Sequence, residues 1–140
     1  MTRTVGLLLG AAAIVVSLDL GQKQLAISDR GGSVYLHDRP LRYVVAGAAL
    51  TLSWAGAIAL TRSALMAVPG GVVLGGAAGN LISFALWPSL PGVPDPIVAG
   101  GLAFSLGDVA VGLGLALLVP ATLVFAARNR SRLLEPPGAT

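Results

Sequence analysis

The chain has 140 residues, of which 55% are hydrophobic and 11% charged, and its net charge is +3. A soluble domain carries about 25% charged residues, so this composition and a mean hydropathy of +0.84 place most of the chain in a membrane. The absence of cysteine excludes disulfides, thiolate metal sites and a cysteine nucleophile, and the single histidine excludes a histidine-rich metal centre. No basic face with interleaved aromatic residues exists, so we expect no binding of nucleic acid.

Four apolar blocks are long enough to cross a bilayer, which takes about 20 residues in a helix. They cover residues 4–26, 41–60, 65–87 and 103–127. We therefore predict an all-α membrane protein, a four-transmembrane-helix bundle that forms a single integral membrane domain of residues 1–140. Residues 28–40 and 88–101 connect blocks at one end, and we expect the tail at 128–140 to be frayed.

The basic residues indicate the orientation of this bundle. Five lie on the side of the termini and four on the other side: Arg3, Arg62, Arg128, Arg130 and Arg132 against Lys23, Arg30, Arg39 and Arg42. The positive-inside rule therefore favours cytoplasmic termini. We expect the first block to be retained rather than cleaved as a secretory signal, because Asp19 and Lys23 interrupt its end and no small-x-small site follows.

Small residues recur at four-residue spacing in three of the blocks. These are Gly6 and Gly10, then Ala49, Ser53 and Ala57, then Gly71, Gly75 and Gly79. Such ridges let helix backbones approach closely where lipid gives no hydrophobic drive for association. We predict that each ridge is a packing interface.

Three aspartates fall near one end of the predicted bundle. Asp19 lies near the exit of the first block, Asp95 in the connection at 88–101, and Asp108 just inside the fourth block. The up-and-down path of the chain brings Asn80 and Ser83 to the same level. Ionisable residues are costly in a membrane and mark functional sites.

Asp19 and Lys23 are four residues apart with the acid first, which is the favourable order for a helical ion pair. We interpret them as a structural pair with Lys23 reaching the headgroups, or as a support for a nearby site. His37, Asp38 and Arg39 fit a solvated or headgroup-facing loop. The chain has no phosphate loop, dinucleotide fingerprint or metalloprotease motif.

Asp95 and Asp108 each have a structural interpretation beside a functional one. Asp95 stands between two prolines, which fits a turn, and Asp108 fits a helix start, where the macrodipole favours an acid. Together the two carboxylates could face each other and share one proton. One would then act as general base on a water while the other donates a proton, which is aspartic peptidase chemistry.

Four segments resemble motifs of signal peptidase II, the prolipoprotein signal peptidase. They are Asp19-Leu20-Gly21-Gln22-Lys23, Gly75-Gly76-Ala77-Ala78-Gly79-Asn80-Leu81-Ile82, Val93-Pro94-Asp95-Pro96-Ile97 and Phe104-Ser105-Leu106-Gly107-Asp108. The corresponding family motifs are Asp-x-x-Thr-Lys, Gly-Gly-x-x-Gly-Asn-x-x, Val-Val-Asp-Phe-Ile and Phe-Asn-x-Ala-Asp. Order, spacing and the four-span plan are similar along nearly the whole chain.

The resemblance implies an aspartic endopeptidase of the bacterial plasma membrane that cleaves lipid-modified precursors just before a diacylglyceryl cysteine. Asp95 and Asp108 would be the catalytic pair, near the outer face of the membrane. The supporting residues would be Asn80, Asp19, Lys23 and Ser105. No cofactor or metal is implied, and the partners would be diacylglyceryl-modified prolipoproteins and membrane lipids. We expect a monomer, with a small extracytoplasmic loop or β-cradle between the first two helices.

The chain departs from the family at three positions and in its first loop. Ser83 and Phe84 replace an Asp-Arg pair, Ser105 replaces an asparagine, and the loop lacks an Asn-x-Gly-Ala-Phe-Ser stretch. A second hypothesis is therefore a catalytically inactive relative, a scaffold that binds lipidated or membrane partners. A third is a small oligomeric transporter or channel subunit with Asp19 and Asp108 in a relay.

Overall fold

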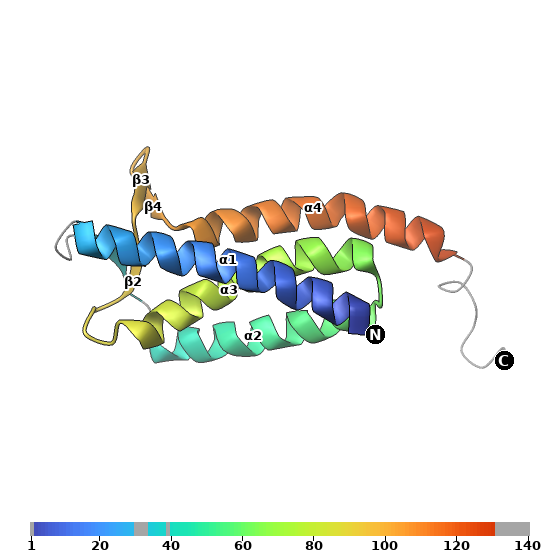
Figure 1. Ribbon diagram of the computed structural model, residues 1–140, viewed down its shortest axis with the longest axis horizontal. Coiled ribbons are helices and arrows are strands. Elements are labelled where there is room, and N and C mark those ends of the chain that lie inside the picture. Colours follow the sequence, from blue (N-terminus) through green and yellow to red (C-terminus); the bar gives the residue numbers. More distant parts are fainter. Residues whose placement is uncertain (1, 30–33, 39, 131–140) are drawn as a thin grey trace.

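The computed structural model describes residues 2–29, 34–38 and 40–130, which form four long helices and four short strands (Figure 1). The helices are α1 (Thr2–Asp29), α2 (Leu41–Leu60), α3 (Ala64–Leu86) and α4 (Leu106–Arg128). The strands are β1 (Tyr35–His37), β2 (Val93–Asp95), β3 (Ile97–Ala99) and β4 (Leu102–Phe104). Each helix is long and apolar enough to cross a membrane, so the predicted four-helix plan is confirmed.

Two predicted helix boundaries are wrong by about one turn. Helix α1 continues to Asp29 rather than ending at 26, and α4 begins at Leu106 rather than at 103. The later start of α4 has a local cause, because β4 occupies Leu102–Phe104 and Ser105 caps the helix. Of the predicted tail at 128–140, Arg128 is the last residue of α4, and residues 131–140 lie outside the described residues.

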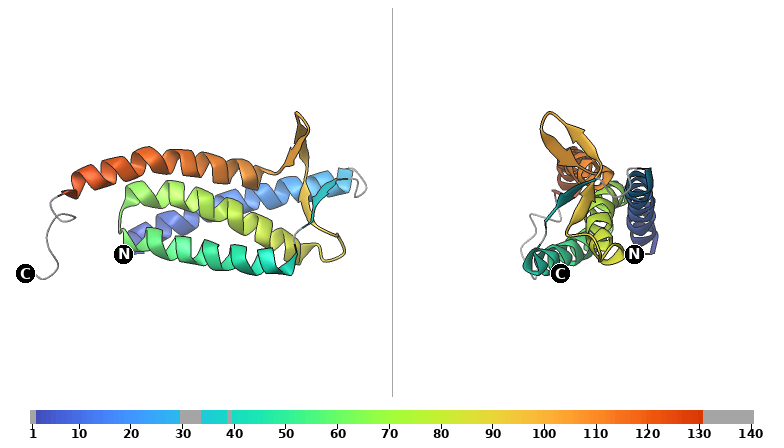
Figure 2. Two further views of the ribbon diagram at one scale, coloured as in Figure 1. Left: turned by 180° about the vertical axis from the view of Figure 1, so that it is seen from behind. Right: turned by 90° about the vertical axis from the view of Figure 1, so that its left-hand side faces the viewer.

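Helix α3 is the centre of the bundle and packs against α1, α2 and α4 (Figure 2). More than half of the most apolar part of α3 is buried inside the protein, whereas only a small share of that part of α2 is buried. Helix α2 packs mainly on α3, and its one buried residue is Ile58. The buried apolar core lies at the end away from the strands and includes Leu8, Ala67 and Leu118.

The glycine ridge of α3 explains its close contact with α1. A Cβ atom at Gly75 would lie 2.6 Å from the Ala12 carbonyl oxygen, and one at Gly79 would lie 2.5 Å from Asp19 Oδ2. Gly71 likewise faces the backbone of α1, at Leu8. The predicted packing role of this ridge is confirmed.

The other two predicted ridges are wrong. Gly6 and Gly10 have no neighbour within 4 Å of an added Cβ, and Ala49, Ser53 and Ala57 are all exposed. Helix α1 turns a different face, that of Leu8 and Ala12, toward α3. Helix α2 turns the face of Trp54 and Ile58 inward.

The described strands form two antiparallel pairs, and β1 lies in the predicted place between the first two helices. Strand β1 pairs with β2, so that Tyr35 lies opposite Asp95 and His37 opposite Val93. One strand of this pair comes from the α1–α2 connection and the other from the α3–α4 connection. Strands β3 and β4 form a hairpin of their own. The short β1–β2 pair tolerates Pro94 because a two-stranded sheet consists only of edges.

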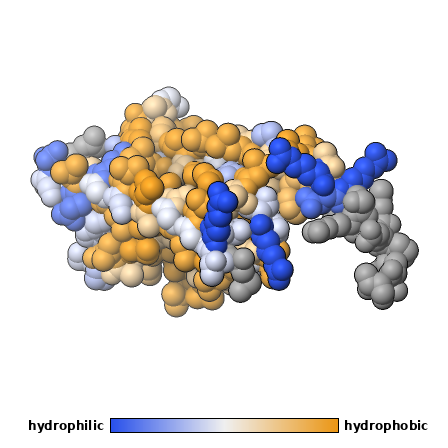
Figure 3. Space-filling model, turned by 45° about the vertical axis from the view of Figure 1, so that its right-hand side comes forward, coloured by the Kyte–Doolittle hydropathy of each residue, from blue (hydrophilic) through white to orange (hydrophobic). Residues whose placement is uncertain are grey.

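Hydropathy divides the surface into an apolar middle and polar ends (Figure 3). Side chains such as Leu50, Leu52, Leu113 and Leu123 are more than half exposed, as expected for helices that face acyl chains. This surface is compatible with a multi-pass membrane protein.

The glycine ridge generates a stability prediction. Gly75→Ala should force α1 and α3 apart and lower the thermal stability in detergent micelles, at a cost of about 1–3 kcal/mol for overpacking. Gly10→Ala is the matched control, because it makes the same change in a helix but meets open space. Equal midpoints of thermal unfolding for the two variants would contradict this packing.

Candidate functional site

The site is built around an ion pair within α1. Lys23 Nζ lies 2.6 Å from Asp19 Oδ2, and both side chains are 0% exposed. The four-residue spacing puts the two groups on one face of the helix, as predicted. The interpretation that Lys23 extends to the headgroups is wrong, because its ammonium is enclosed by protein.

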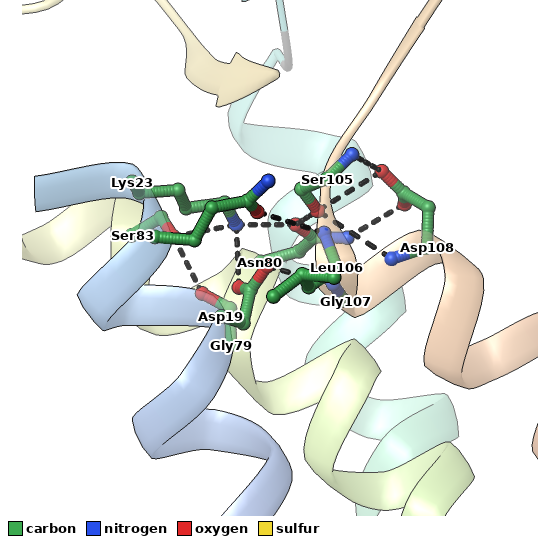
Figure 4. A network of polar contacts seen from close by, with 10 residues as sticks. Asp19, Lys23, Gly79, Asn80, Ser83, Ser105, Leu106, Gly107 and Asp108 are labelled. Carbon is green, nitrogen blue, oxygen red and sulfur yellow. Dashed lines mark hydrogen bonds and ion pairs between the residues drawn. The ribbon is translucent and has the colours of Figure 1, made fainter. Parts of the chain in front are cut away.

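Helix α3 supplies the other two partners of this ammonium. Lys23 Nζ donates to Asn80 Oδ1 at 2.7 Å and to Ser83 Oγ at 3.0 Å (Figure 4). Ser83 in turn donates to the Gly79 carbonyl oxygen at 2.6 Å. An ammonium group has three protons, and all three therefore have an acceptor: Asp19, Asn80 and Ser83.

Asp19 also links α1 to the start of α4. The Gly107 amide donates to Asp19 Oδ1 at 2.7 Å, so a carboxylate sits at the positive end of a helix. The approach depends on glycine, because a Cβ at Gly107 would lie 3.1 Å from Asp19 Oδ1. One carboxylate thus joins two helices that have few other contacts with each other.

Asp108 belongs to a capping box that starts α4. Its Oδ2 accepts from the Ser105 amide at 2.9 Å and from Ser105 Oγ at 3.1 Å, while Ser105 Oγ accepts from the Asp108 amide at 3.4 Å. Its Oδ1 accepts from Asn80 Nδ2 at 2.9 Å. Both carboxylate oxygens are therefore fixed in direction.

Asn80 is the bridge between the ion pair and Asp108. Its carbonyl oxygen accepts from Lys23 and its amide nitrogen donates to Asp108. Ser105 Oγ also lies 3.3 Å from Asn80 Oδ1. The position of the Asp108 carboxylate is thus coupled through one side chain to the buried charge on α1.

Asp95 lies in a second group of contacts, at the end of β2. It is buried, and its Oδ2 is 3.6 Å from Nδ1 of His37, whose side chain is 55% exposed. The hydrogen bonds of the Asp108 carboxylate go to Asn80 and Ser105, so the direct pairing of Asp95 with Asp108 stays a prediction.

An apolar groove leads away from Asp108 between α2 and α4. A hollow of about 310 Å³ is lined by Asn80 and Asp108 at one end and by residues of α2 and α3. A second hollow, of about 320 Å³, continues around Trp54. The two share four lining residues: Leu50, Thr51, Ala77 and Val111. The carboxylate therefore stands at the head of a groove that descends toward the middle of the bundle.

Sequence reasoning missed the positions of two residues. His37 is exposed, which agrees with a solvated or headgroup-facing position, but it belongs to β1, and the pairing with β2 brings its ring near Asp95. Gln22 was not singled out, yet its Oε1 accepts from the Leu106 amide at 3.0 Å. Gln22 follows Asp19 by one helical turn, so it shares the face of α1 that meets α4; the position of His37 depends on a long-range strand pairing with no local signal.

No protein family, curated protein or solved structure matches this chain. Among the described residues, no group of three His, Cys, Asp or Glu side chains could hold a metal ion. What the described groups can do chemically is fix the orientation of a carboxylate that borders an apolar groove.

The buried ion pair generates a second prediction. Lys23→Met should destabilise the protein by about 3–5 kcal/mol, because removing one partner leaves a buried charge uncompensated. The double variant Asp19→Leu, Lys23→Met removes both charges and should recover part of that loss. Unfolding by titration with a denaturing detergent measures both. A double variant that is no more stable than Lys23→Met would contradict a pairwise electrostatic origin.

Proposed function

We propose that this chain is a divergent signal peptidase II, an aspartic endopeptidase of the bacterial plasma membrane. Its substrates would be lipid-modified precursor proteins, cut just before the diacylglyceryl cysteine. The observation that carries the proposal is the position of Asp108, a carboxylate oriented by Asn80 and Ser105 at the head of an apolar groove. A second buried carboxylate, Asp95, lies in the segment that leads into the same helix.

In the proposed reaction, Asp95 and Asp108 act on one water molecule. One carboxylate takes a proton from the water, whose oxygen attacks the peptide carbonyl, and the other carboxyl group gives its proton to the leaving amine. Asn80 acts as a positioning residue, because its side-chain amide donates a hydrogen bond to Asp108 Oδ1 and so fixes the orientation of the carboxylate.

The groove supports a lipid-modified substrate in particular. A groove within the membrane-spanning part of a bundle opens toward acyl chains rather than water, and its lining is mostly apolar. Ligand sites of this kind combine an apolar lining with a few polar groups that fix orientation. The diacylglyceryl chains would lie along α2 and α3, with the adjacent peptide bond at the polar end.

The alternative is a catalytically inactive relative that binds lipidated segments or membrane partners. One observation favours it: every hydrogen bond of Asp108 has a structural use, since the carboxylate completes the capping box of α4 and bridges to α3. A scaffold would need the same carboxylate for folding alone. Hydrolysis distinguishes the two functions directly.

The first test is cleavage of a diacylglyceryl-modified precursor peptide by the purified protein in detergent micelles. Asp95→Asn and Asp108→Asn should each lower the rate by about 10²–10⁴-fold, the usual contribution of a general acid or base. Asparagine keeps the size and one acceptor oxygen of aspartate, so the fold should survive. Asp38→Asn is the control, since Asp38 is an exposed aspartate at the same end of the bundle.

Two outcomes would reject an aspartic peptidase that uses Asp95 and Asp108. Cleavage that persists in both Asp→Asn variants would remove these residues from the chemistry. A wild-type protein that binds the lipopeptide but never cuts it would favour the scaffold, and Ser83, Phe84 and Ser105 would be the positions to restore to the family residues.

The groove generates a further prediction. Ala77→Phe places a bulky ring between the two hollows and should raise KM for a diacylated peptide much more than it changes kcat. Ala85→Phe is the matched control, because Ala85 is an exposed residue of the same helix. An unchanged KM in Ala77→Phe would exclude the groove as the lipid subsite while leaving the aspartates untouched.

A further inference from the structure

We propose that the β3–β4 hairpin lies in the membrane interface, with its side chains among the acyl chains. The inference rests on the four helices spanning a bilayer and does not depend on hydrolysis. It concerns residues 97–104, which the candidate catalytic chemistry does not use.

Composition is the first argument. All six strand residues are apolar: Ile97, Val98 and Ala99 in β3, and Leu102, Ala103 and Phe104 in β4. A hairpin with one wet face alternates apolar and polar residues, because successive side chains point to opposite faces. Here both faces are apolar, which indicates an apolar medium on both sides of the hairpin.

Exposure is the second argument. Val98 is 64% and Leu102 71% exposed, so the protein itself leaves these side chains uncovered. A free two-stranded hairpin is marginally stable in water, and one with an apolar exposed edge is an aggregation hazard. Gly100 and Gly101 both have positive φ, as a tight two-residue hairpin turn requires, so the hairpin has a defined turn and not an irregular loop.

The direction of the hairpin is the third argument. It stands away from the helices, across the long axis of the bundle and at its strand-bearing end (Figures 1 and 2). If the bundle axis follows the membrane normal, the hairpin lies roughly parallel to the membrane plane. Tyr35 and Tyr43, which are 56% and 60% exposed, lie at the same end, and Trp87 ends α3 there. Tyrosine and tryptophan are enriched at membrane interfaces.

The unpaired backbone groups of the hairpin limit how deeply it can lie in the membrane. The outer edges of a two-stranded hairpin carry unpaired N–H and C=O groups, which are too costly for the hydrocarbon core. At the interface, headgroups and water satisfy these groups while the side chains reach the upper acyl chains. The hairpin therefore belongs at the interface rather than deeper in the membrane or in bulk water.

The position of the hairpin in the chain links it to the candidate site. Pro96 alone separates it from Asp95, and Ser105 alone separates it from α4. Residues 97–104 thus connect the segment of Asp95 to the helix of Asp108. Contact with lipid would hold β2 at a defined height above the start of α4.

The test uses single cysteines, which the cysteine-free chain permits without background. The full-length variants Val98→Cys and Leu102→Cys are labelled with an environment-sensitive nitrobenzoxadiazole dye. They are placed in nanodiscs of phosphatidylcholine and phosphatidylglycerol, one protein per disc. Leu113→Cys, on an exposed position of α4, is the lipid-facing control. Asp38→Cys is the water-facing control at the strand-bearing end.

We expect blue-shifted emission at positions 98 and 102, quenching by lipids with a nitroxide high on the acyl chain, and protection from aqueous iodide. Position 113 should instead be quenched best by a nitroxide deep on the chain. Iodide quenching at 98 and 102 equal to that at position 38 would overturn the proposal. Protection from iodide without quenching by nitroxide lipid would also overturn it, because the cover would then be protein, such as a second copy or a bound peptide.

A second measurement tests the side chains of Val98 and Leu102 without placing a dye at either position. Val98→Thr with Leu102→Thr puts a β-branched side chain, which suits a strand, at both positions while adding polarity. The Cys label is moved to Ala99. The label at 99 should lose nitroxide quenching and gain iodide access relative to the same label in an otherwise unchanged chain. Unchanged quenching would show that the side chains of Val98 and Leu102 do not hold the hairpin in the lipid.

Discussion

The ammonium of Lys23 is the group on which the arrangement of the bundle depends. Its side chain is 0% exposed, and taking such an ion out of water costs several kcal/mol unless its protons are satisfied. The acceptors come from α1 and α3, so these helices can pack only in the register that presents Asp19, Asn80 and Ser83. Because Asp19 also accepts from the Gly107 amide, the same requirement fixes the start of α4, and glycines at the contacts leave room for it.

The hydrophobic pattern predicted the four helices because crossing a bilayer imposes a length and a composition that each segment shows by itself. The Asp19–Lys23 pair was likewise predictable from a spacing of four. The choice among three small-residue ridges was not, since spacing does not say which face of a helix meets a neighbour. The proximity of His37 to Asp95 required the pairing of β1 with β2, and residues so distant in sequence carry no common local signal.

Ser83 keeps the buried polar group electrically neutral. Its Oγ accepts from Lys23 at 3.0 Å but adds no charge, so the group stays balanced with one carboxylate and one ammonium. An aspartate at position 83 would bring an extra negative charge into this enclosed group. Phe84, the next residue, lines the apolar groove.

The capping box at Asp108 ties the beginning of a helix to a group proposed for catalysis, and this shapes how the chain can change over evolutionary time. A lineage that abandoned hydrolysis would still need an acceptor at position 108, because the first turn of α4 and the amide of Asn80 both use it. Position 108 should therefore keep a side chain that accepts hydrogen bonds, whether or not the chain hydrolyses peptide bonds.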